Sequence, residues 1–400
     1  MRPSRSSIAT AGAVVALGAF AGLVAAGFEH AVIEIALGHL LEAPLVVQAV
    51  TPIGGLVLAM LVVRHLGRPS STTPIDDYIA SAGHGRLLDH TLAPSRITAC
   101  AATLASGCAL GLDAPALYAG GAMGSAAARR WPRVRADALV VGTAAGAVAA
   151  VLQMPIVGAL FAIELPYRRG LRTTQLPYAL AGAVPGWLVY RSITQAHRFF
   201  GGFDPHVRGR DVLLAVSLGV VASVVARVAG LMFRHAKMRH AHPMVAGAFL
   251  AVTFVVGRAV AGSSVTLGPG TIATGWAAKG PAVVAIVAVI GLRLAAASAA
   301  LAGSGIGGIF FPLLALGGLS GAMLDGGHPL AVLLGAAACV ATAYRVPWTA
   351  LALVATVTLS LPATALAALA IMVARVFGVG VRSTNAQVRP RRGARSVPGQ

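Results

Sequence analysis

The sequence predicts an all-α polytopic membrane protein built from two inverted-topology repeats of tilted and broken helices. Of its 400 residues, 57% are hydrophobic and only 11% are charged, whereas a soluble domain carries about 25% charged residues. The mean hydropathy is +0.81. The 48 glycines and 22 prolines interrupt the apolar runs repeatedly. In addition, one pattern of glycine and proline occurs in both halves of the chain.

Residues 1–43 are expected to form the N-terminal start and a first helix. The apolar run from Ile8 to Phe28 is longer than the hydrophobic core of a secretory signal, and further apolar runs follow it. We therefore expect a retained membrane helix rather than a cleaved signal. Arg2 and Arg5 place the N-terminus in the cytoplasm by the positive-inside rule.

Residues 44–195 and 212–380 are expected to form the first and second repeats, joined by a linker loop at 196–211. Many apolar runs are shorter than the about 20 residues that a straight membrane helix needs. Broken helices are therefore expected, with their irregular backbone buried inside the protein. Segments 64–96 and 191–210 are polar and predict loops. The apolar runs lie near 44–63, 99–128, 136–163, 177–190, 212–233, 244–261, 282–302, 306–324, 330–343 and 347–380.

Residues 381–400 are basic and low in hydrophobicity, which predicts a disordered cytoplasmic tail. With both termini inside, the chain would cross the cell membrane an even number of times. The formal net charge of +19 lies mostly in such loops and in the tail, so it indicates topology in a lipid bilayer and not a nucleic-acid partner. Cys100, Cys108 and Cys339 lie in apolar runs without metal-ligand spacing, so neither a metal nor another cofactor is expected.

The internal repeat is the most informative pattern. GLDAPALYAGGAMG at 111–124 and GIFFPLLALGGLSG at 308–321 share the pattern GxxxPxxxxGGxxG. Downstream, PIVGALFAIE at 155–164 matches PWTALALVAT at 347–356, each an apolar helix opened by proline. Both pairs are separated by about 195 residues, and a duplicated hydrophobic unit is typical of transporters and channels built from two repeats.

Each GxxxP motif fits a helix that begins inside the membrane. Proline suits the first turn of a helix because its missing N–H would have no partner there, and glycine lets the backbone approach a ligand closely. The free N–H groups of a helix start, together with the helix dipole, bind anions without a cationic side chain. Two such starts predict an anion pathway.

The motifs resemble those of the CLC chloride channels and chloride/proton antiporters, over roughly residues 45–380. GLDAP at 111–115 stands where that family has GREGP, and GIFFP at 308–312 matches its GxFxP. QMPIVGALFAIE at 153–164 is similar to FNAPLAGxLFxIEE, and YRVP at 344–347 to IRAP.

The resemblance implies a gating role for Asp113 at the position of the family's glutamate. It also implies anion binding by the backbone of Gly111, Leu112 and Ala114 and of Gly308, Ile309 and Phe310. An acid buried at membrane depth is costly and usually functional, which supports the role of Asp113. Family members are homodimers, so the resemblance implies a dimer here.

The sequence departs from the family at several positions. SSTTP at 70–74 occupies the GSGIP position and keeps a hydroxyl at Ser71 but neither glycine. Leu165 stands where antiporters carry the proton glutamate, so Glu164 is either part of a proton path or an acceptor of hydrogen bonds at a helix end. The family's anion-binding tyrosine near the C-terminus has no counterpart, and Ser383 is the nearest hydroxyl.

These departures favour passive, channel-like conduction of chloride or a related small anion, held by helix N-termini and gated by Asp113. A chloride/proton antiporter is the main alternative, and a non-conducting homologue is a third. An enzyme is not expected, because the chain has no HExxH motif, no GxSxG motif with a histidine partner and no paired aspartates on apolar helices.

Overall fold

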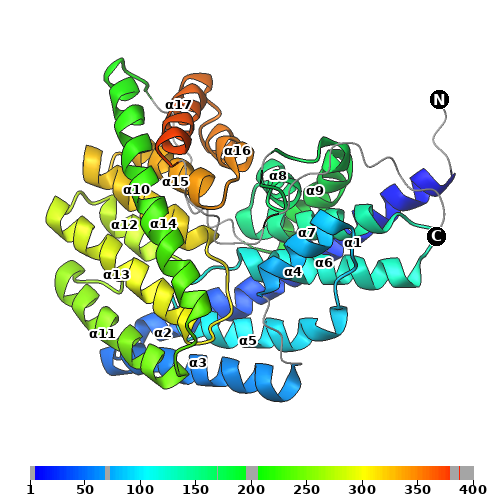
Figure 1. Ribbon diagram of the computed structural model, residues 1–400, viewed down its shortest axis with the longest axis horizontal. Coiled ribbons are helices and arrows are strands. Elements are labelled where there is room, and N and C mark those ends of the chain that lie inside the picture. Colours follow the sequence, from blue (N-terminus) through cyan, green and yellow to red (C-terminus); the bar gives the residue numbers. More distant parts are fainter. Residues whose placement is uncertain (1–4, 68–72, 169, 195–205, 379–386, 388–400) are drawn as a thin grey trace.

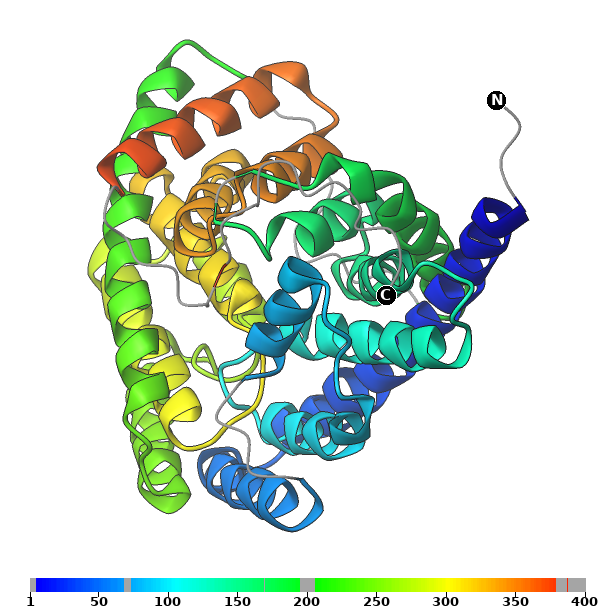
Figure 2. The same ribbon diagram turned by 45° about the vertical axis from the view of Figure 1, so that its right-hand side comes forward.

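The structure, a computed structural model, describes residues 5–67, 73–168, 170–194, 206–378 and 387. These residues form helices and no β-strand, and an isolated bridge joins Gly111 to Gly308. The predicted all-α class is confirmed. Figures 1 and 2 show α4–α9 gathered on one side of the molecule and α10–α17 on the other, with α3 packed on α11.

The first half of the chain contains an oblique N-terminal helix followed by shorter ones. Their bounds are α1 (Arg5–Glu29), the π-helical η1 (His30–Leu37), α2 (Gly38–Glu42), α3 (Leu45–Leu66), α4 (Pro74–His84), η2 (His90–Leu92), α5 (Ala93–Ala105), α6 (Asp113–Arg130), α7 (Ala136–Leu152), α8 (Pro155–Glu164), η3 (Thr173–Gln175) and α9 (Leu176–Ile193).

The second half begins with the long helix α10 and ends with three short helices. Their bounds are α10 (Arg210–Met238), α11 (Pro243–Ala261), α12 (Thr271–Ala277), α13 (Val283–Ala302), α14 (Phe310–Asp325), α15 (Pro329–Ala343), α16 (Pro347–Thr358) and α17 (Leu361–Phe377). Proline opens many of these helices, including α8 and α16, because a first-turn residue needs no N–H partner.

Five helical segments in the described part of the chain are long and apolar enough to cross a membrane: Ile8–Glu42, Leu45–Leu66, Arg210–Met238, Pro243–Ala261 and Val283–Ala302. The shorter helices α7, α14 and α15 are almost entirely buried among the others. Irregular backbone next to them is therefore enclosed in protein, as membrane insertion requires.

The two repeats share their local geometry. The series α5 to α9 corresponds to α13 to α17, with α6 and α14 each followed by a packed partner, α7 and α15. Gln153 and Arg345 each lie two residues before the proline that opens α8 or α16, and both have left-handed backbones, with φ of 56° and 61°. Because non-glycine residues rarely adopt this conformation, its occurrence at matching positions supports the duplication.

Close glycine contacts hold α1, α7 and α9 together. A Cβ atom on Gly182 of α9 would lie 1.9 Å from the carbonyl oxygen of Gly142 on α7. One on Gly18 of α1 would lie 2.5 Å from the carbonyl oxygen of Gly182. Small residues let membrane helices approach to backbone contact, so the first helix packs as part of the same body as the first repeat.

The structure corrects several expected boundaries. The segment 64–96, expected to be a loop, contains α4, whose Ile75, Tyr78 and Ile79 are buried while its opposite face is polar. The run near 99–128 is divided into α5 and α6 by the turn that carries Gly107, where φ is 85°. The first helical segment continues past Phe28 to Glu42 through a π-helical stretch.

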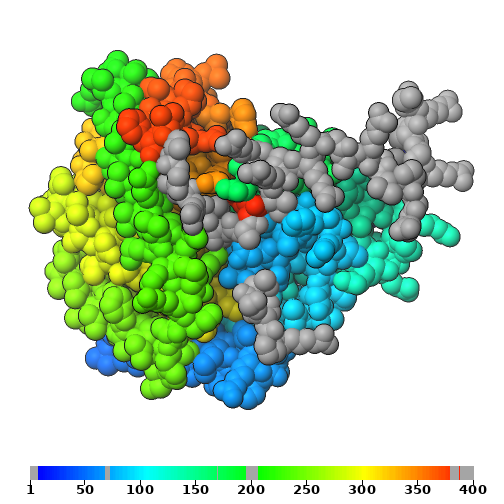
Figure 3. Space-filling model, in the orientation of Figure 1, coloured from blue at the N-terminus to red at the C-terminus, as the bar shows by residue number. Residues whose placement is uncertain are grey.

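The two halves meet in the middle of the molecule. Lys237 at the end of α10 lies 3.6 Å from Asp76 in the first turn of α4. Figure 3 shows this side of the molecule, where α10 runs down beside the first half. The starts of α6 and α14 lie between the halves, and these starts carry the candidate site.

Candidate functional site

The starts of α6 and α14 are joined backbone to backbone. The N–H of Gly111 donates to the carbonyl of Gly308 at 2.8 Å, and the N–H of Gly308 donates to the carbonyl of Gly111 at 2.7 Å. This corrects the expectation that both glycines donate N–H groups to an anion, because their donors are already paired with each other. The glycines instead bring the two helix starts within reach of one site.

Asp113 occupies the centre of this junction. Its side chain is fully buried, and its Oδ2 accepts hydrogen bonds from the N–H of Phe310 at 3.3 Å and from the hydroxyl of Tyr344 at 3.2 Å. A Cβ atom on Gly308 would lie 2.0 Å from Oδ1 of Asp113, so only glycine leaves room for the carboxylate. The first residue of α6 thus reaches across to the start of α14.

The hydrogen-bond donors around Asp113 lie at the start of α14. The N–H of Ile309 points at the hydroxyl oxygen of Tyr344 at 3.4 Å, next to the N–H of Phe310 on the carboxylate. N–H groups at a helix start carry partial positive charge and bind anions. In this structure, a carboxylate and a phenol oxygen of the protein itself occupy those donors.

The remaining predicted backbone ligands lie beside this junction. Ala114 is buried and lines the cavity described below. Leu112 is also buried, and its side chain lines a different, apolar pocket. Ser71 and Ser383 lie outside the described residues.

Tyr344 is the site residue that the sequence analysis missed. It follows α15 directly, is fully buried, and packs its ring against Phe161 and Phe310 with centroid separations of 5.9 and 6.0 Å. Tyr344 belongs to the YRVP motif and not to the C-terminal segment, where the resemblance places the family's tyrosine. The available signal was its position in that motif, three residues before the proline that opens α16.

A cavity of about 820 Å³, here called the vestibule, leads to the site. Ile309, Tyr344 and Ala114, which belong to the site or lie beside it, are among its lining residues. Its walls carry both signs of charge, but cationic side chains predominate over the acid Asp76. A basic entrance concentrates anions near a pore. The polar and charged wall residues are Arg64, Thr73, Asp76, Ser95, Arg96, Lys237, His240 and Ser304.

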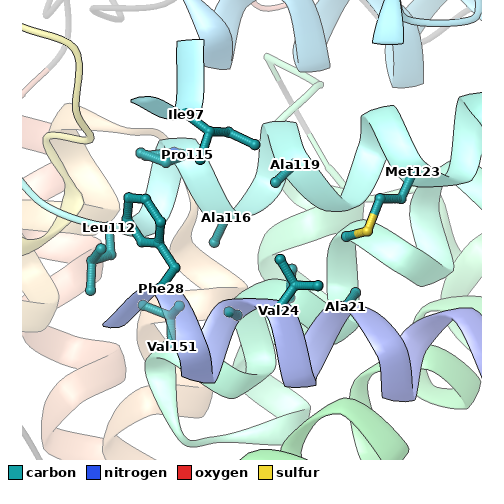
Figure 4. A pocket seen from close by; sticks show the side chains of 12 residues that line it. Ala21, Val24, Phe28, Ile97, Leu112, Pro115, Ala116, Ala119, Met123 and Val151 are labelled. Carbon is teal, nitrogen blue, oxygen red and sulfur yellow. The ribbon is translucent and has the colours of Figure 1, made fainter. Parts of the chain in front are cut away.

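The opposite side of the α6 start is closed by apolar packing. Figure 4 shows Leu112 and Pro115 facing Phe28 and Val151 around a pocket of about 30 Å³ lined by apolar side chains from α1, α5, α6 and α7. An apolar cavity of this size stays dry. It therefore offers an anion neither space nor donors, in contrast to the vestibule.

The α4 helix start differs from those of α6 and α14. Thr73 donates to Asp76 at 2.5 Å, and Arg96 is hydrogen-bonded to Asp77. Asp76 and Asp77 lie in the first turn of α4. Their negative charges already complement the positive end of the helix dipole. This terminus is less suited to an added anion than the start of α14.

Glu164 ends α8 and caps α16. Its carboxylate accepts from the N–H of Trp348 at 3.0 Å and from the N–H and hydroxyl of Thr349, both at 2.7 Å. A carboxylate at a helix N-terminus satisfies donors that the helix itself cannot pair. Of the two roles that the sequence left open, this geometry describes the helix-end acceptor.

Replacing Glu164 with alanine should lower the thermal stability of the purified protein. The change leaves the N–H groups of Trp348 and Thr349 buried without their acceptor, at a cost of roughly 2 kcal/mol. Glutamine keeps one acceptor oxygen, so its effect should be smaller, and glutamine at the exposed Glu42 is the matched control. A Glu164→Gln protein of unchanged stability that no longer moves protons would instead assign this residue to a proton path.

Gln387 contacts both repeats. Its side-chain amide donates to the carbonyls of Leu165 at 3.0 Å and Tyr344 at 2.9 Å. It thereby connects the residue after α8 with the residue after α15. The rest of the expected tail lies outside the described residues.

Comparisons with known proteins agree with this architecture. The family model "Voltage gated chloride channel" matches residues 54–378. No curated protein sequence matches the chain.

Solved structures share the fold, and the following three are among them. They are a slow cyanobacterial Cl−/H+ antiporter (TM-score 0.77, 18% identity, covering 96% of both chains), a CLC-type fluoride/proton antiporter (TM-score 0.76, 18% identity, covering 96% of this chain and 100% of that one) and a eukaryotic CLC transporter (TM-score 0.69, 16% identity, covering 93% and 72%). The family model covers most of the chain, and the helix starts that it includes form the site. The protein therefore belongs to the CLC family of voltage gated chloride channels and transporters.

Proposed function

We propose that this protein exchanges a small anion, such as chloride or fluoride, for protons across the cell membrane. Asp113 would be both the gate and the proton-carrying group. The observation that carries the proposal is that the carboxylate of Asp113 is fully buried and bonded to the donors of the anion site. An anion can use these donors only after the carboxylate has left them.

Protonation of Asp113 provides the means of release. A neutral carboxyl group accepts weaker hydrogen bonds than a carboxylate does, because charge-assisted bonds are about twice as strong. An ionised carboxylate also repels an anion at the same donors, whereas a protonated one does not. Anion entry and proton uptake therefore favour each other, which is the linkage that an exchanger needs.

The relatives support exchange over passive conduction. Two of the solved structures with this fold are described as a Cl−/H+ and a fluoride/proton antiporter.

The basic wall of the vestibule supports a cytoplasmic opening by the positive-inside rule, with both termini on that side. The antiporter relatives and the basic vestibule are both consistent with the buried carboxylate of Asp113 as gate and proton carrier.

Passive conduction is the second candidate, and Leu165 favours it. This fully buried residue supplies no carboxylate at the position where the family's antiporters hold their second proton acceptor. Protons must then reach Asp113 by another route, or not at all.

Flux measurements on the reconstituted protein decide between these functions. Liposomes are loaded with chloride or fluoride, diluted into a solution without that anion, and followed with an anion electrode and a pH electrode. Exchange predicts that protons move against their own gradient, driven by the anion gradient. Anion release without proton movement would establish passive conduction, and absence of both would identify a non-conducting homologue.

A further inference from the structure

The hydroxyl of Tyr344 lies between the vestibule and Asp113. Both side chains are fully buried, but Tyr344 is among the residues that line the vestibule and Asp113 is not. The hydroxyl donates to Oδ2 of Asp113 at 3.2 Å. In the described part of the chain, this is the side-chain hydrogen bond that leads from the carboxylate towards the cavity.

The surroundings of Tyr344 hold its hydroxyl in place. Phe161 and Phe310 pack against the ring, and the N–H of Ile309 donates to the phenol oxygen at 3.4 Å. This N–H fixes the orientation of the phenol oxygen and occupies one of its lone pairs, which leaves the other able to accept a proton. The oxygen is thus positioned both to give a proton and to receive one.

Other acidic groups are poorly placed for this task. Glu164 has its oxygens engaged by the start of α16, and Leu165 is apolar. Asp76 lines the vestibule and is paired with Lys237 at 3.6 Å. A vestibule of about 820 Å³ has room for a chain of waters, each of which occupies about 30 Å³ in the liquid.

We propose that the hydroxyl of Tyr344 relays protons between water in the vestibule and Asp113. A hydronium ion in the vestibule gives a proton to the phenol oxygen while the phenol hydrogen moves to Oδ2 of Asp113. One O–H bond forms and one breaks at Tyr344, which ends unchanged, and Asp113 becomes neutral. The reverse sequence returns the proton to the vestibule.

This relay rests on the proposed anion/proton exchange. It supplies a route for protons to Asp113 that does not need an acid at position 165. It also separates two properties of Tyr344. The ring fills space beside the anion site, and the hydroxyl carries the proton. The two properties can be tested independently because phenylalanine keeps the ring.

The test compares Tyr344→Phe with Tyr78→Phe in chloride-loaded liposomes. Tyr78 is equally buried, and its hydroxyl donates to the carbonyl of Ala162 at 2.9 Å, so its loss is a matched control for removing one buried hydroxyl. Losing a proton-transfer group should slow proton movement by about a hundredfold. Anion movement in Tyr344→Phe should persist, and Tyr78→Phe should keep the proton-to-anion ratio of the wild type.

Each other outcome overturns the relay. A Tyr344→Phe protein that exchanges at the wild-type ratio shows that the hydroxyl is not needed. A folded variant that loses both fluxes makes Tyr344 a positioning residue. If the wild type moves anions without protons, the exchange itself fails, and the relay fails with it.

A second variant keeps the test valid if phenylalanine prevents folding. Incorporating 3,5-difluorotyrosine at position 344 retains the hydroxyl and nearly the same size while making the phenol more acidic. The relay predicts a changed rate of proton movement with unchanged anion affinity. An unchanged proton rate would contradict it.

Discussion

Replacing Asp113 with asparagine should yield a protein that moves anions without protons. Asparagine has nearly the same size and can accept the hydrogen bond from Phe310, but it does not take up a proton near neutral pH. The exchange described above requires a group that alternates between an anionic state, which occupies the donors of the site, and a neutral state, which releases them. Without that alternation, anion movement no longer drives protons.

The same change should remove the pH dependence of anion flux. In the wild type, flux should rise as the pH falls, because protonation of Asp113 frees the N–H of Phe310 for the anion. The protonated fraction of a carboxyl group changes by up to about tenfold for each pH unit above its pKa. The asparagine variant should give a flat profile over that range.

Chloride release from liposomes between pH 4.5 and pH 8 measures this effect, with Asp137→Asn as the control. Asp137 is paired with Arg135 at the exposed start of α7, at 2.9 Å, so its neutral variant should keep both the pH dependence and the proton movement. If the Asp113 variant still drove protons uphill, another group would have to carry them, and the gate assignment would be wrong.

Replacing Gly308 with alanine should disrupt the site from the backbone side. The new Cβ would lie 2.0 Å from Oδ1, 2.2 Å from Cγ and 2.3 Å from Oδ2 of Asp113, so the side chain of Asp113 must move. Forcing an extra methyl group into a packed interior costs about 1–3 kcal/mol. The displaced carboxylate also loses the donors of Phe310 and Tyr344, so proton-coupled exchange should fall to background.

Thermal unfolding in detergent and liposome flux together measure this effect. Gly291→Ala on α13 is the control, because a Cβ there meets no atom within 4 Å and alanine favours a helix by up to about 1 kcal/mol. Combining Gly308→Ala with Asp113→Ala should recover part of the lost stability, since residues in direct contact are not additive. A single Gly308→Ala protein with wild-type stability and exchange would show that the carboxylate does not occupy this position.

The central part of the site could be predicted because it depends on local chain geometry. Glycine and proline spacing placed helix starts at 111–115 and 308–312, and Asp113 was the acid within them. In the structure α6 begins at Asp113 and α14 at Phe310, whereas anion binding by Ile309 and Phe310 stays a prediction. These features need only the conformational limits of glycine and proline and the behaviour of helix ends.

Other parts of the site depend on contacts between distant segments. The pairing of Gly111 with Gly308 uses N–H groups that looked available in either motif alone. The hydroxyl of Tyr344 contacts Asp113, which lies 231 positions earlier in the chain. The family resemblance placed the expected tyrosine near the C-terminus and so did not indicate Tyr344. Glu164 could be assigned as a cap of α16 only after the two repeats had been brought together in space.

Buried polar groups were also hard to anticipate. Arg293 is the largest fully buried side chain among the described residues, and its guanidinium donates to the carbonyls of Val265 at 2.7 Å and Gly268 at 3.1 Å. In the sequence it is one arginine within an apolar helix, which is equally consistent with a side chain that extends to the membrane surface. Arg293 stays inside the protein because the loop with Val265 and Gly268 supplies carbonyl acceptors for its guanidinium.

The paired glycines have a mechanical consequence. Two backbone hydrogen bonds between Gly111 and Gly308 fasten the repeats together beside the carboxylate. A transport cycle in which the repeats swing apart at this point would have to break both bonds at every turnover. Under the proposed exchange, both bonds can stay intact while the side chain of Asp113 alone leaves and re-enters the site.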